Sequence, residues 1–215
     1  KIMIIFMWSG PRNLSTALMR SFENRKDTYV LDEPFYAYYL KKTGLNHPMK
    51  KEIINHYPTS QKQILKIITE KTKNNEIFYQ KHMTHHIIKN TRLDWLNKGH
   101  NCFLIRHPAK VINSYIKKNS LMNIDDIGFK KQYEIFNKLK KNKINYTVIN
   151  ADMILRDPSK TIKKLCKILK IRFTKKMLNW PKGKRSSDGI WSKVWYKNVE
   201  LSNSFSKFKK ENYNV

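Results

Sequence analysis

The chain has 215 residues, a length that one α/β domain accounts for and that is sufficient for a full hydrophobic core. It contains 44 Lys and Arg against 16 Asp and Glu, so its net charge is +28, and 40% of its residues are hydrophobic. The two cysteines, Cys102 and Cys166, lie in apolar segments without C-x-x-C or Cys/His spacing, which argues against a disulfide-stapled secreted fold.

The high positive charge is compatible with nucleic-acid binding. It comes mostly from Lys residues spread along the whole chain, however, and a composition rich in Lys, Asn and Ile is typical of an AT-rich genome. We therefore expect a general attraction for anionic small molecules and no specific nucleic-acid partner. The apolar run at the start is too short to span a membrane, and no signal peptide is evident, so we expect a cytoplasmic protein.

The first predicted element is a strand over residues 2–8, a continuous apolar run of the kind that buried parallel strands show. A polar loop follows, and apolar residues then recur at helical spacing. We expect a helix here, with Asn13 or Ser15 as its N-terminal cap.

A strand, a polar loop and a helix start together favour phosphate binding, because free N–H groups and the helix dipole point at the loop. Arg12 adds a planar donor fork suited to phosphate or sulfate, and Ser15 and Thr16 add hydroxyl donors. The alternative is a plain strand-to-helix turn capped by Asn13. The second Gly and the Lys of the ordinary nucleotide loop are absent. The predicted binding loop consists of Ser9, Gly10, Pro11, Arg12, Asn13, Leu14, Ser15 and Thr16.

Two carboxylates follow the second predicted strand, over residues 28–31. Asp32 and Glu33 then lie at the edge where ligands of parallel α/β sheets bind. Pro34 is suited to open the next helix. The alternative is that the two carboxylates cap that helix and complement its dipole.

The chain from 41 to 59 contains Gly and Pro breakers and is predicted to be irregular; within it, residues 44–58 are a candidate lid. A helix over residues 60–73 and a third strand over residues 76–81 are predicted next.

The third strand ends in one Lys and three His residues: Lys81, His82, His85 and His86. No carboxylate or Cys completes a zinc site locally, so we expect no metal. A His that acts as an acid or base, with Lys81 as an anion donor, fits this pattern better. A helix over residues 87–96 is predicted to follow.

The fourth strand, over residues 101–105, is a clear buried strand that leads into Arg106. Pro108 begins the next helix, and Ser114 lies about two turns along it. An Arg at the strand end and a Ser on the adjoining helix can both contact one phosphate. The alternative is a surface Arg and an ordinary helical Ser.

A helix over residues 129–141, a fifth strand over residues 145–149 and a helix from Pro158 complete an alternation that predicts a parallel sheet covered on both sides. The tail contains a basic loop over residues 180–196, bracketed by Trp residues. Basic donors beside aromatic rings suit a ligand with a phosphate and a purine, although a solvated linker is an equal alternative.

These motifs together resemble the sulfotransferase family that uses 3′-phosphoadenosine 5′-phosphosulfate (PAPS). Residues 9–16 resemble the family's 5′-phosphosulfate loop, P-[KR]-S-G-T-[ST], except that Asn13 and Leu14 stand where Ser-Gly is usual. Arg106 and Ser114 match the 3′-phosphate motif R-[DNH]-P-x(5)-S. The tail residues that weakly resemble the family's R-K-G-x-x-G loop are Lys182, Gly183, Lys184 and Arg185.

The resemblance implies a single α/β domain over residues 1–215, with three layers and a P-loop-like sulfotransferase fold. It implies transfer of a sulfuryl group from PAPS to a hydroxyl or amine of a small-molecule acceptor, with adenosine 3′,5′-bisphosphate as product. It further implies that Glu33 is the general base, with His82 as second choice, and that Arg12 and Lys81 stabilise the transferred group.

Three other functions remain open at this point. The chain is alternatively a nucleotide-dependent kinase with an unusual loop, a family member that binds nucleotide without catalysis, or a nucleic-acid-binding protein whose +28 charge carries the binding.

Overall fold

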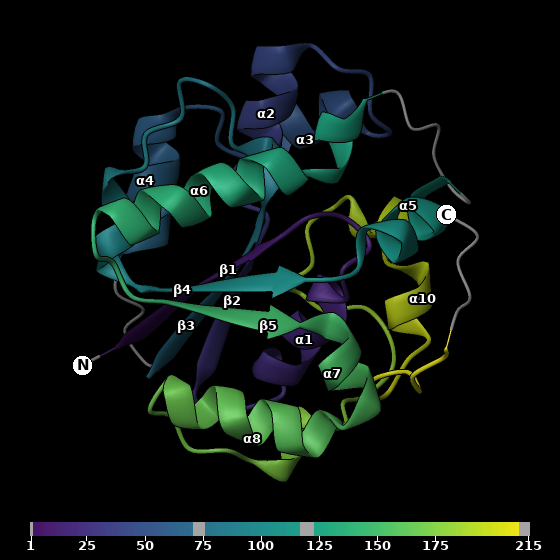
Figure 1. The fold of residues 1–215 in the computed structure, drawn as a ribbon. Coiled ribbons are helices and arrows are strands. Elements are labelled where there is room, and N and C mark those ends of the chain that lie inside the picture. Colours follow the sequence, from purple (N-terminus) through teal and green to yellow (C-terminus); the bar gives the residue numbers. More distant parts are fainter. Residues whose placement is uncertain (1, 71–75, 117–122, 211–215) are drawn as a thin grey trace.

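A computed structural model describes residues 2–70, 76–116 and 123–210. In this part of the chain five strands form one parallel sheet in the order β2-β3-β1-β4-β5 (Figure 1). The strands are β1 (Met3–Ser9), β2 (Thr28–Asp32), β3 (Ile77–Met83), β4 (His100–Ile105) and β5 (Tyr146–Asn150).

Helices cover both faces of this sheet, because alternate residues of each strand point to opposite sides. On one side Ile5 and Met7 of β1 belong to a buried cluster with α1 (Ser15–Glu23) and α8 (Pro158–Ile168). On the other side Phe6 and Trp8 pack with α4 (Gln61–Thr69) and α6 (Phe129–Lys141). The predicted three-layer α/β fold is therefore confirmed.

The remaining helices lie mostly at the ends of the strands. They are α2 (Tyr36–Thr43), α3 (Lys50–His56), α5 (Pro108–Ile116), α7 (Ala151–Arg156), α9 (Ser192–Trp195) and α10 (Lys197–Glu200). Short 3₁₀ turns are η1 (Thr84–His86), η2 (Asp94–Lys98), η3 (Ile124–Ile127) and η4 (Lys175–Met177).

Three predicted segments differ from the structure in whole or in part. The expected helix over residues 87–96 is wrong, because the chain is irregular up to residue 93 and then enters η2. The segment 41–59 is not wholly irregular, since α2 runs to Thr43 and α3 lies within it, with Ile53 buried in the core. The predicted helix over residues 60–73 ends at Thr69 as α4, and residues 71–75 lie outside the described part of the chain.

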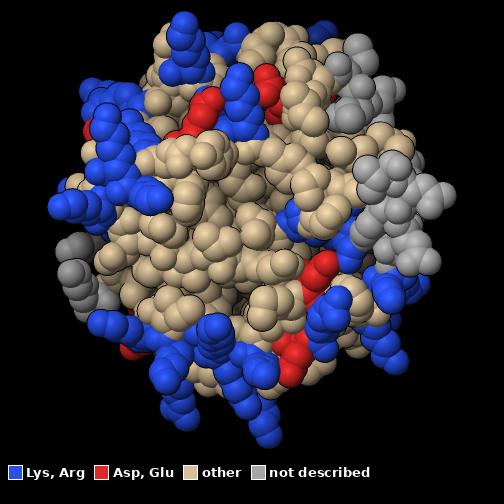
Figure 2. Space-filling model, in the orientation of Figure 1, with Lys and Arg blue, Asp and Glu red and all other residues tan. Residues whose placement is uncertain are grey.

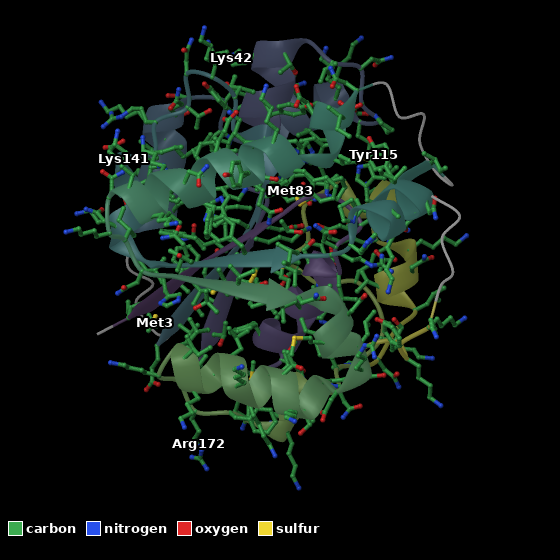
Figure 3. The ribbon with its side chains drawn as sticks, viewed as in Figure 1. Met3, Lys42, Met83, Tyr115, Lys141 and Arg172 are labelled. Carbon is green, nitrogen blue, oxygen red and sulfur yellow. The ribbon has the colours of Figure 1, made fainter. Side chains whose placement is uncertain are left out.

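The sheet has two functionally different ends. Figure 3 shows Met3 at the N-terminal end of β1 and Met83 at the C-terminal end of β3, well inside the molecule. Ligands of parallel α/β sheets bind at the C-terminal end of the strands. The loops after β1, β2, β3 and β4 all leave from this end.

The positive charge is not gathered in one place on the face that Figure 2 shows. Lys and Arg lie around its margin, and uncharged residues fill its centre. This face of the described chain therefore lacks the continuous basic patch that nucleic-acid-binding surfaces present. Within the described residues, no helix is both long and apolar enough to cross a membrane.

Replacement of Phe22 by Ala tests the packing of α1 on the sheet. The Phe22 side chain is fully buried, and its ring stacks on Tyr79 of β3 with 4.5 Å between centroids. We expect the variant to lose about 3–5 kcal/mol of unfolding free energy in urea denaturation. The control Tyr133→Ala, whose side chain is 65% exposed, should change it by about 0.5 kcal/mol or less. Equal losses in both variants would contradict this packing.

Candidate active site

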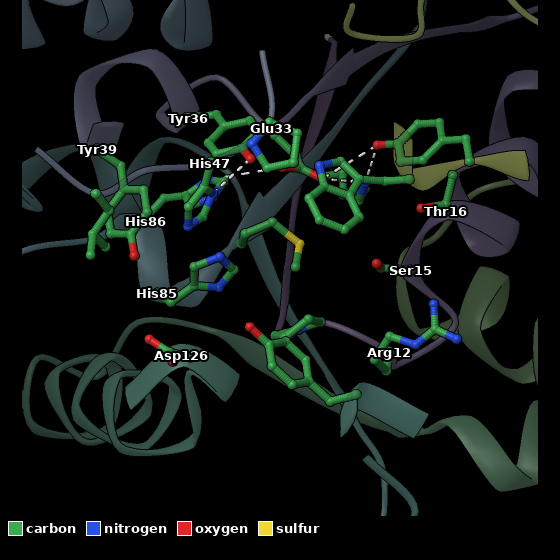
Figure 4. Close-up of a pocket in the computed structure, with 18 of the residues that line it drawn as sticks. Arg12, Ser15, Thr16, Glu33, Tyr36, Tyr39, His47, His85, His86 and Asp126 are labelled. Atoms are coloured by element: carbon green, nitrogen blue, oxygen red, sulfur yellow. Dashed lines mark hydrogen bonds and ion pairs between the residues drawn. The ribbon is translucent and has the colours of Figure 1, made fainter. Parts of the chain in front are cut away.

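A pocket of about 390 Å³ opens at the C-terminal end of the strands (Figure 4). Five groups of residues border it: the loop after β1, the ends of β2 and β3 with η1, aromatic residues from α2, α5 and the segment 195–196, the loop between α2 and α3, and Asp126 of η3. Its lining residues are Pro11, Arg12, Ser15, Thr16, Glu33, Tyr36, Tyr39, Leu45, Asn46, His47, Pro48, Lys81, Met83, His85, His86, Tyr115, Asp126, Trp195 and Tyr196.

The loop between β1 and α1 has an uncommon backbone. Arg12 and Leu14 have φ values of 64° and 69°, in the left-handed region that non-glycine residues seldom occupy. Leu14 is the N-terminal cap residue of α1 and provides no side-chain hydrogen bond, so the predicted cap by Asn13 or Ser15 is wrong. Asn13 is instead buried, and its side-chain amide has no hydrogen-bond partner in the described chain.

Gly10 allows this loop to approach η3 closely. A Cβ atom at Gly10 would lie 2.3 Å from the carbonyl oxygen of Ile127, a backbone atom that cannot rotate away. The loop and η3 are therefore held together at the border of the pocket.

The two anion-binding motifs predicted from the sequence meet in space. The Nε atom of Arg12 donates a hydrogen bond to Ser114 Oγ at 2.9 Å, and Nη1 of Arg106 donates to the Arg12 carbonyl oxygen at 3.1 Å. Burial and the nearby charge of Arg106 lower the pKa of Arg12, although a guanidinium remains protonated in proteins. The Arg106 guanidinium, whose Nε atom also lies 4.0 Å from Asp152 Oδ1, is thus near enough for its charge to act on Arg12, and two neighbouring guanidinium groups favour an anion beside them.

A buried ammonium group joins the ends of β2 and β3. The side chain of Lys81 is 1% exposed, and its Nζ atom donates to Asp32 Oδ1 at 3.0 Å and to Glu33 Oε1 at 2.7 Å. Nζ also contacts the hydroxyl of Tyr196, which donates to Asp32 Oδ2 at 2.6 Å. Although burial acts to lower the pKa of Lys81, the charges of Asp32 and Glu33 outweigh it and raise that pKa. Lys81 is therefore a fully paired cation.

Glu33 directs one carboxylate oxygen into the pocket. Its Oε1 atom accepts from Lys81, whereas Oε2 lies 4.0 Å from Nδ1 of His86, whose pKa burial lowers well below its ordinary value. Burial raises the pKa of Glu33, and the neighbouring charge of Asp32 adds to the rise while that of Lys81 opposes it. A carboxylate with a raised pKa and a free oxygen in a pocket is suited to accept a proton. Asp32 and Glu33 do not cap α2, which has no side-chain cap.

His82 lies on the opposite face of β3 from Lys81, because consecutive strand residues alternate. Its side chain is buried between Trp8 and other rings, and its Nε2 atom is 3.0 Å from Gln80 Oε1. Burial lowers the pKa of His82 to about 3. His82 does not line the pocket, whereas His85 and His86 do.

Only the later part of the basic loop over residues 180–196 reaches the pocket. None of Lys182, Gly183, Lys184 and Arg185 lines the pocket. Arg185 lies 3.7 Å from Glu23 of α1, and the Gly183 amide donates to the Glu200 carbonyl oxygen at 2.7 Å. The later part of the segment does reach the site, through Trp195 and Tyr196. The closure of residues 182–185 on a 3′-phosphate remains a prediction.

Several pocket residues were not predicted from the sequence. His47, Tyr115 and Asp126 line the pocket from three separate loops or helices. Tyr115 follows Ser114 directly, and this adjacency to a predicted site residue is the signal that was available. His47 lies within residues 44–58, which the sequence marks only as a candidate lid, and Asp126 lies in a segment without a motif, so only the three-dimensional fold places Asp126 here.

Comparisons with known proteins identify the family. The chain matches the family model for the sulfotransferase domain over residues 3–211, and it therefore belongs to this family. Two Arabidopsis thaliana proteins, branched-chain-amino-acid aminotransferase-like proteins 1 and 2, are 34% and 32% identical to it and align with 96% and 94% of the chain. The chain spans only 37% and 36% of the length of these relatives.

Solved structures show the same fold. The sulfotransferase domain from the curacin biosynthetic pathway matches with a TM-score of 0.59 and 18% identity, over 95% of this chain and 84% of that one. The sulfotransferase domain from the Synechococcus PCC 7002 olefin synthase matches with a TM-score of 0.59 and 17% identity, over 99% of this chain and 89% of that one. The predicted sulfotransferase fold is confirmed.

The burial of His82 predicts a specific pH dependence of stability. Because its pKa is lowered to about 3, the unfolded chain binds a proton at a higher pH than the folded chain does. This contribution to stability is complete above about pH 6.5 and is lost progressively at lower pH, by about 1.4 kcal/mol per pH unit. Urea denaturation between pH 6 and pH 4 should therefore show a shallower loss in His82→Asn than in the wild type. Identical slopes would contradict the burial of a neutral His82.

Proposed function

We propose that this chain transfers a sulfuryl group from PAPS to a hydroxyl or amine of a small-molecule acceptor. One observation carries the proposal: Arg12 of the first loop, Ser114 and Arg106 lie in direct contact beside a pocket that also contains Glu33. Membership of the sulfotransferase family supports it. A donor with phosphate groups at its 3′ and 5′ positions matches two cationic motifs at one sheet edge.

The first loop is the proposed site of the 5′-phosphosulfate. Arg12 and the hydroxyl groups of Ser15 and Thr16 line the pocket next to the start of α1, where the helix dipole favours an anion. Arg106 and Ser114 are the proposed site of the 3′-phosphate. Sulfuryl transfer spreads charge over the equatorial oxygens and the bridging oxygen, as phosphoryl transfer does, so fixed positive donors stabilise its transition state.

Glu33 is the proposed general base. The acceptor oxygen or nitrogen attacks sulfur in line and forms the new bond, the bond from sulfur to the bridging oxygen of the 5′-phosphate breaks, and the acceptor proton passes to Oε2 of Glu33. Lys81 directs its donors at Asp32, Glu33 and Tyr196. We therefore assign it to holding Glu33 in place and leave stabilisation of the sulfuryl group to Arg12. His82, which lies outside the pocket, takes no part.

Binding of adenosine 3′,5′-bisphosphate tests the donor site. We expect calorimetry to give tighter binding of this bisphosphate than of 5′-AMP or ATP, and Arg106→Ala to weaken it about 10- to 100-fold, as loss of a charged hydrogen bond predicts. The control Arg172→Ala removes an exposed Arg remote from the pocket and should bind like the wild type. Preference for ATP, or no binding of the bisphosphate, would overturn the sulfotransferase proposal.

Replacement of Glu33 by Gln tests the base. The amide keeps an oxygen that can accept from Lys81 but does not take the acceptor proton, so kcat should fall by about 10²–10⁴-fold while bisphosphate affinity changes little. Release of the bisphosphate from PAPS, measured across a panel of phenols, alcohols and amines, gives the rate. The exposed Glu134→Gln is the control. Full activity in Glu33→Gln together with loss of activity in His82→Ala would reverse the assignment.

A further inference from the structure

The pocket has opposite electrostatic character at its two sides. Among the lining residues that the structure describes, the Lys and Arg residues are Arg12 and Lys81, and Lys81 is held between two carboxylates. The acidic lining residues are Glu33 and Asp126. The part of the pocket away from Arg12 is therefore bordered by carboxylates, and no unpaired Lys or Arg of the described chain lines it. This contrasts with the net charge of +28 of the whole chain.

Asp126 lies away from the residues to which the sequence assigned a function. Figure 4 shows it beyond His85, away from Glu33 and across the pocket from Arg12. Its Oδ2 atom accepts from the backbone amide of Asn123 at 3.1 Å within a capping box of η3. No hydrogen bond or ion pair between its Oδ1 atom and the described residues is found, so this carboxylate is fixed in orientation and retains an oxygen for a ligand.

The charge of Asp126 affects the pKa values of other residues that line the pocket. Burial raises the pKa of Tyr39 to about 12 and also raises that of Tyr115, and the negative charge of Asp126 adds to both shifts. For His47 burial lowers the pKa, and Asp126 opposes that change. The charge of Asp126 therefore acts on three residues that line the same pocket and come from different parts of the chain.

The wall between Glu33 and Asp126 is aromatic and neutral. The ring of His86 stacks on Tyr36 and Tyr39, with centroid distances of 4.5 Å and 4.9 Å. Burial lowers the pKa of His85 to about 3 and that of His86 well below its ordinary value, so both rings are uncharged near neutral pH. Aromatic faces attract cations as well as apolar groups.

We infer that the acceptor carries an ammonium group on an apolar or aromatic body, with its reacting hydroxyl at Glu33 and its ammonium group at Asp126. This inference rests on the proposed function, because it places the reacting hydroxyl at the proposed base. A carboxylate or phosphate on the acceptor would face Asp126 and Glu33 and be repelled, whereas an ammonium group pairs with Asp126 beside electron-rich rings. The cationic donor side and the anionic acceptor side then keep the two substrates apart.

Three phenols that differ in their distal group test the inference: tyramine with an ammonium group, 2-(4-hydroxyphenyl)ethanol with a neutral hydroxyl, and 3-(4-hydroxyphenyl)propanoate with a carboxylate. Their binding is measured by calorimetry on the full chain saturated with adenosine 3′,5′-bisphosphate. We expect the ammonium compound to bind at least about tenfold more tightly than the neutral one, and the carboxylate most weakly.

Two Asp variants on η3 identify the responsible group. Asp126→Asn retains an oxygen for the capping hydrogen bond and removes the charge, so tyramine should lose its advantage over the neutral phenol. Asp125→Asn makes the same charge change at an exposed neighbour outside the pocket and should retain the wild-type order. Because the three-compound comparison in the wild type needs no variant, a folding defect in Asp126→Asn leaves the test intact.

Equal binding of the three phenols, preference for the carboxylate, an unchanged order in Asp126→Asn, or no binding of any phenol overturns the inference. Saturation with the bisphosphate is measured first. If the bisphosphate binds but the phenols show no preference for the ammonium compound, the acceptor class alone is refuted. If the bisphosphate does not bind, the proposed function itself is refuted.

Discussion

The site depends on one buried ammonium group. Lys81 is almost fully removed from water, and such a charge is tolerated inside a protein only when it is paired and hydrogen-bonded. Its partners come from three parts of the chain: Asp32 from β2, Glu33 from the loop after β2, and Tyr196 from the C-terminal segment. Because loss of Lys81 would leave two buried carboxylates without their cation, at a cost of about 3–5 kcal/mol, its ammonium group holds these parts together as a unit.

This network also sets the conformation of Glu33. The residue has a φ of 43°, and its amide donates to the Lys81 carbonyl oxygen at 3.0 Å. Such a backbone is unfavourable for a side chain with a Cβ atom, and it persists because the surrounding contacts determine it. The result is a carboxylate with one oxygen bound to Lys81 and the other directed at the pocket. In the proposed function, positive charge for the donor comes from other residues, namely Arg12 of the first loop and Arg106 after β4.

The sequence predicts the strands and the sheet edge well, because apolar runs and the polar residues that follow them are local features. It also predicts that Arg106 and Ser114 lie near each other, through their spacing within one strand–helix unit, and in the structure both form hydrogen bonds with Arg12. The prediction of a helix over residues 87–96 is wrong because apolar residues in an irregular segment can recur at helical spacing. The position of His82 follows from strand alternation, which places it opposite Lys81, but its packing against Trp8 depends on tertiary structure. The contact of Tyr196 with Lys81 spans more than a hundred residues and has no local signal.

A crystal structure of the complex with adenosine 3′,5′-bisphosphate would show whether the two Arg-containing motifs form the two ends of one nucleotide site beside Glu33. We expect the 5′-phosphate at the first loop with Arg12, the 3′-phosphate at Arg106 and Ser114, and the Glu33 carboxylate facing the 5′ end across the pocket. A bisphosphate bound elsewhere, or bound here with its 5′ end away from Glu33, would contradict this arrangement.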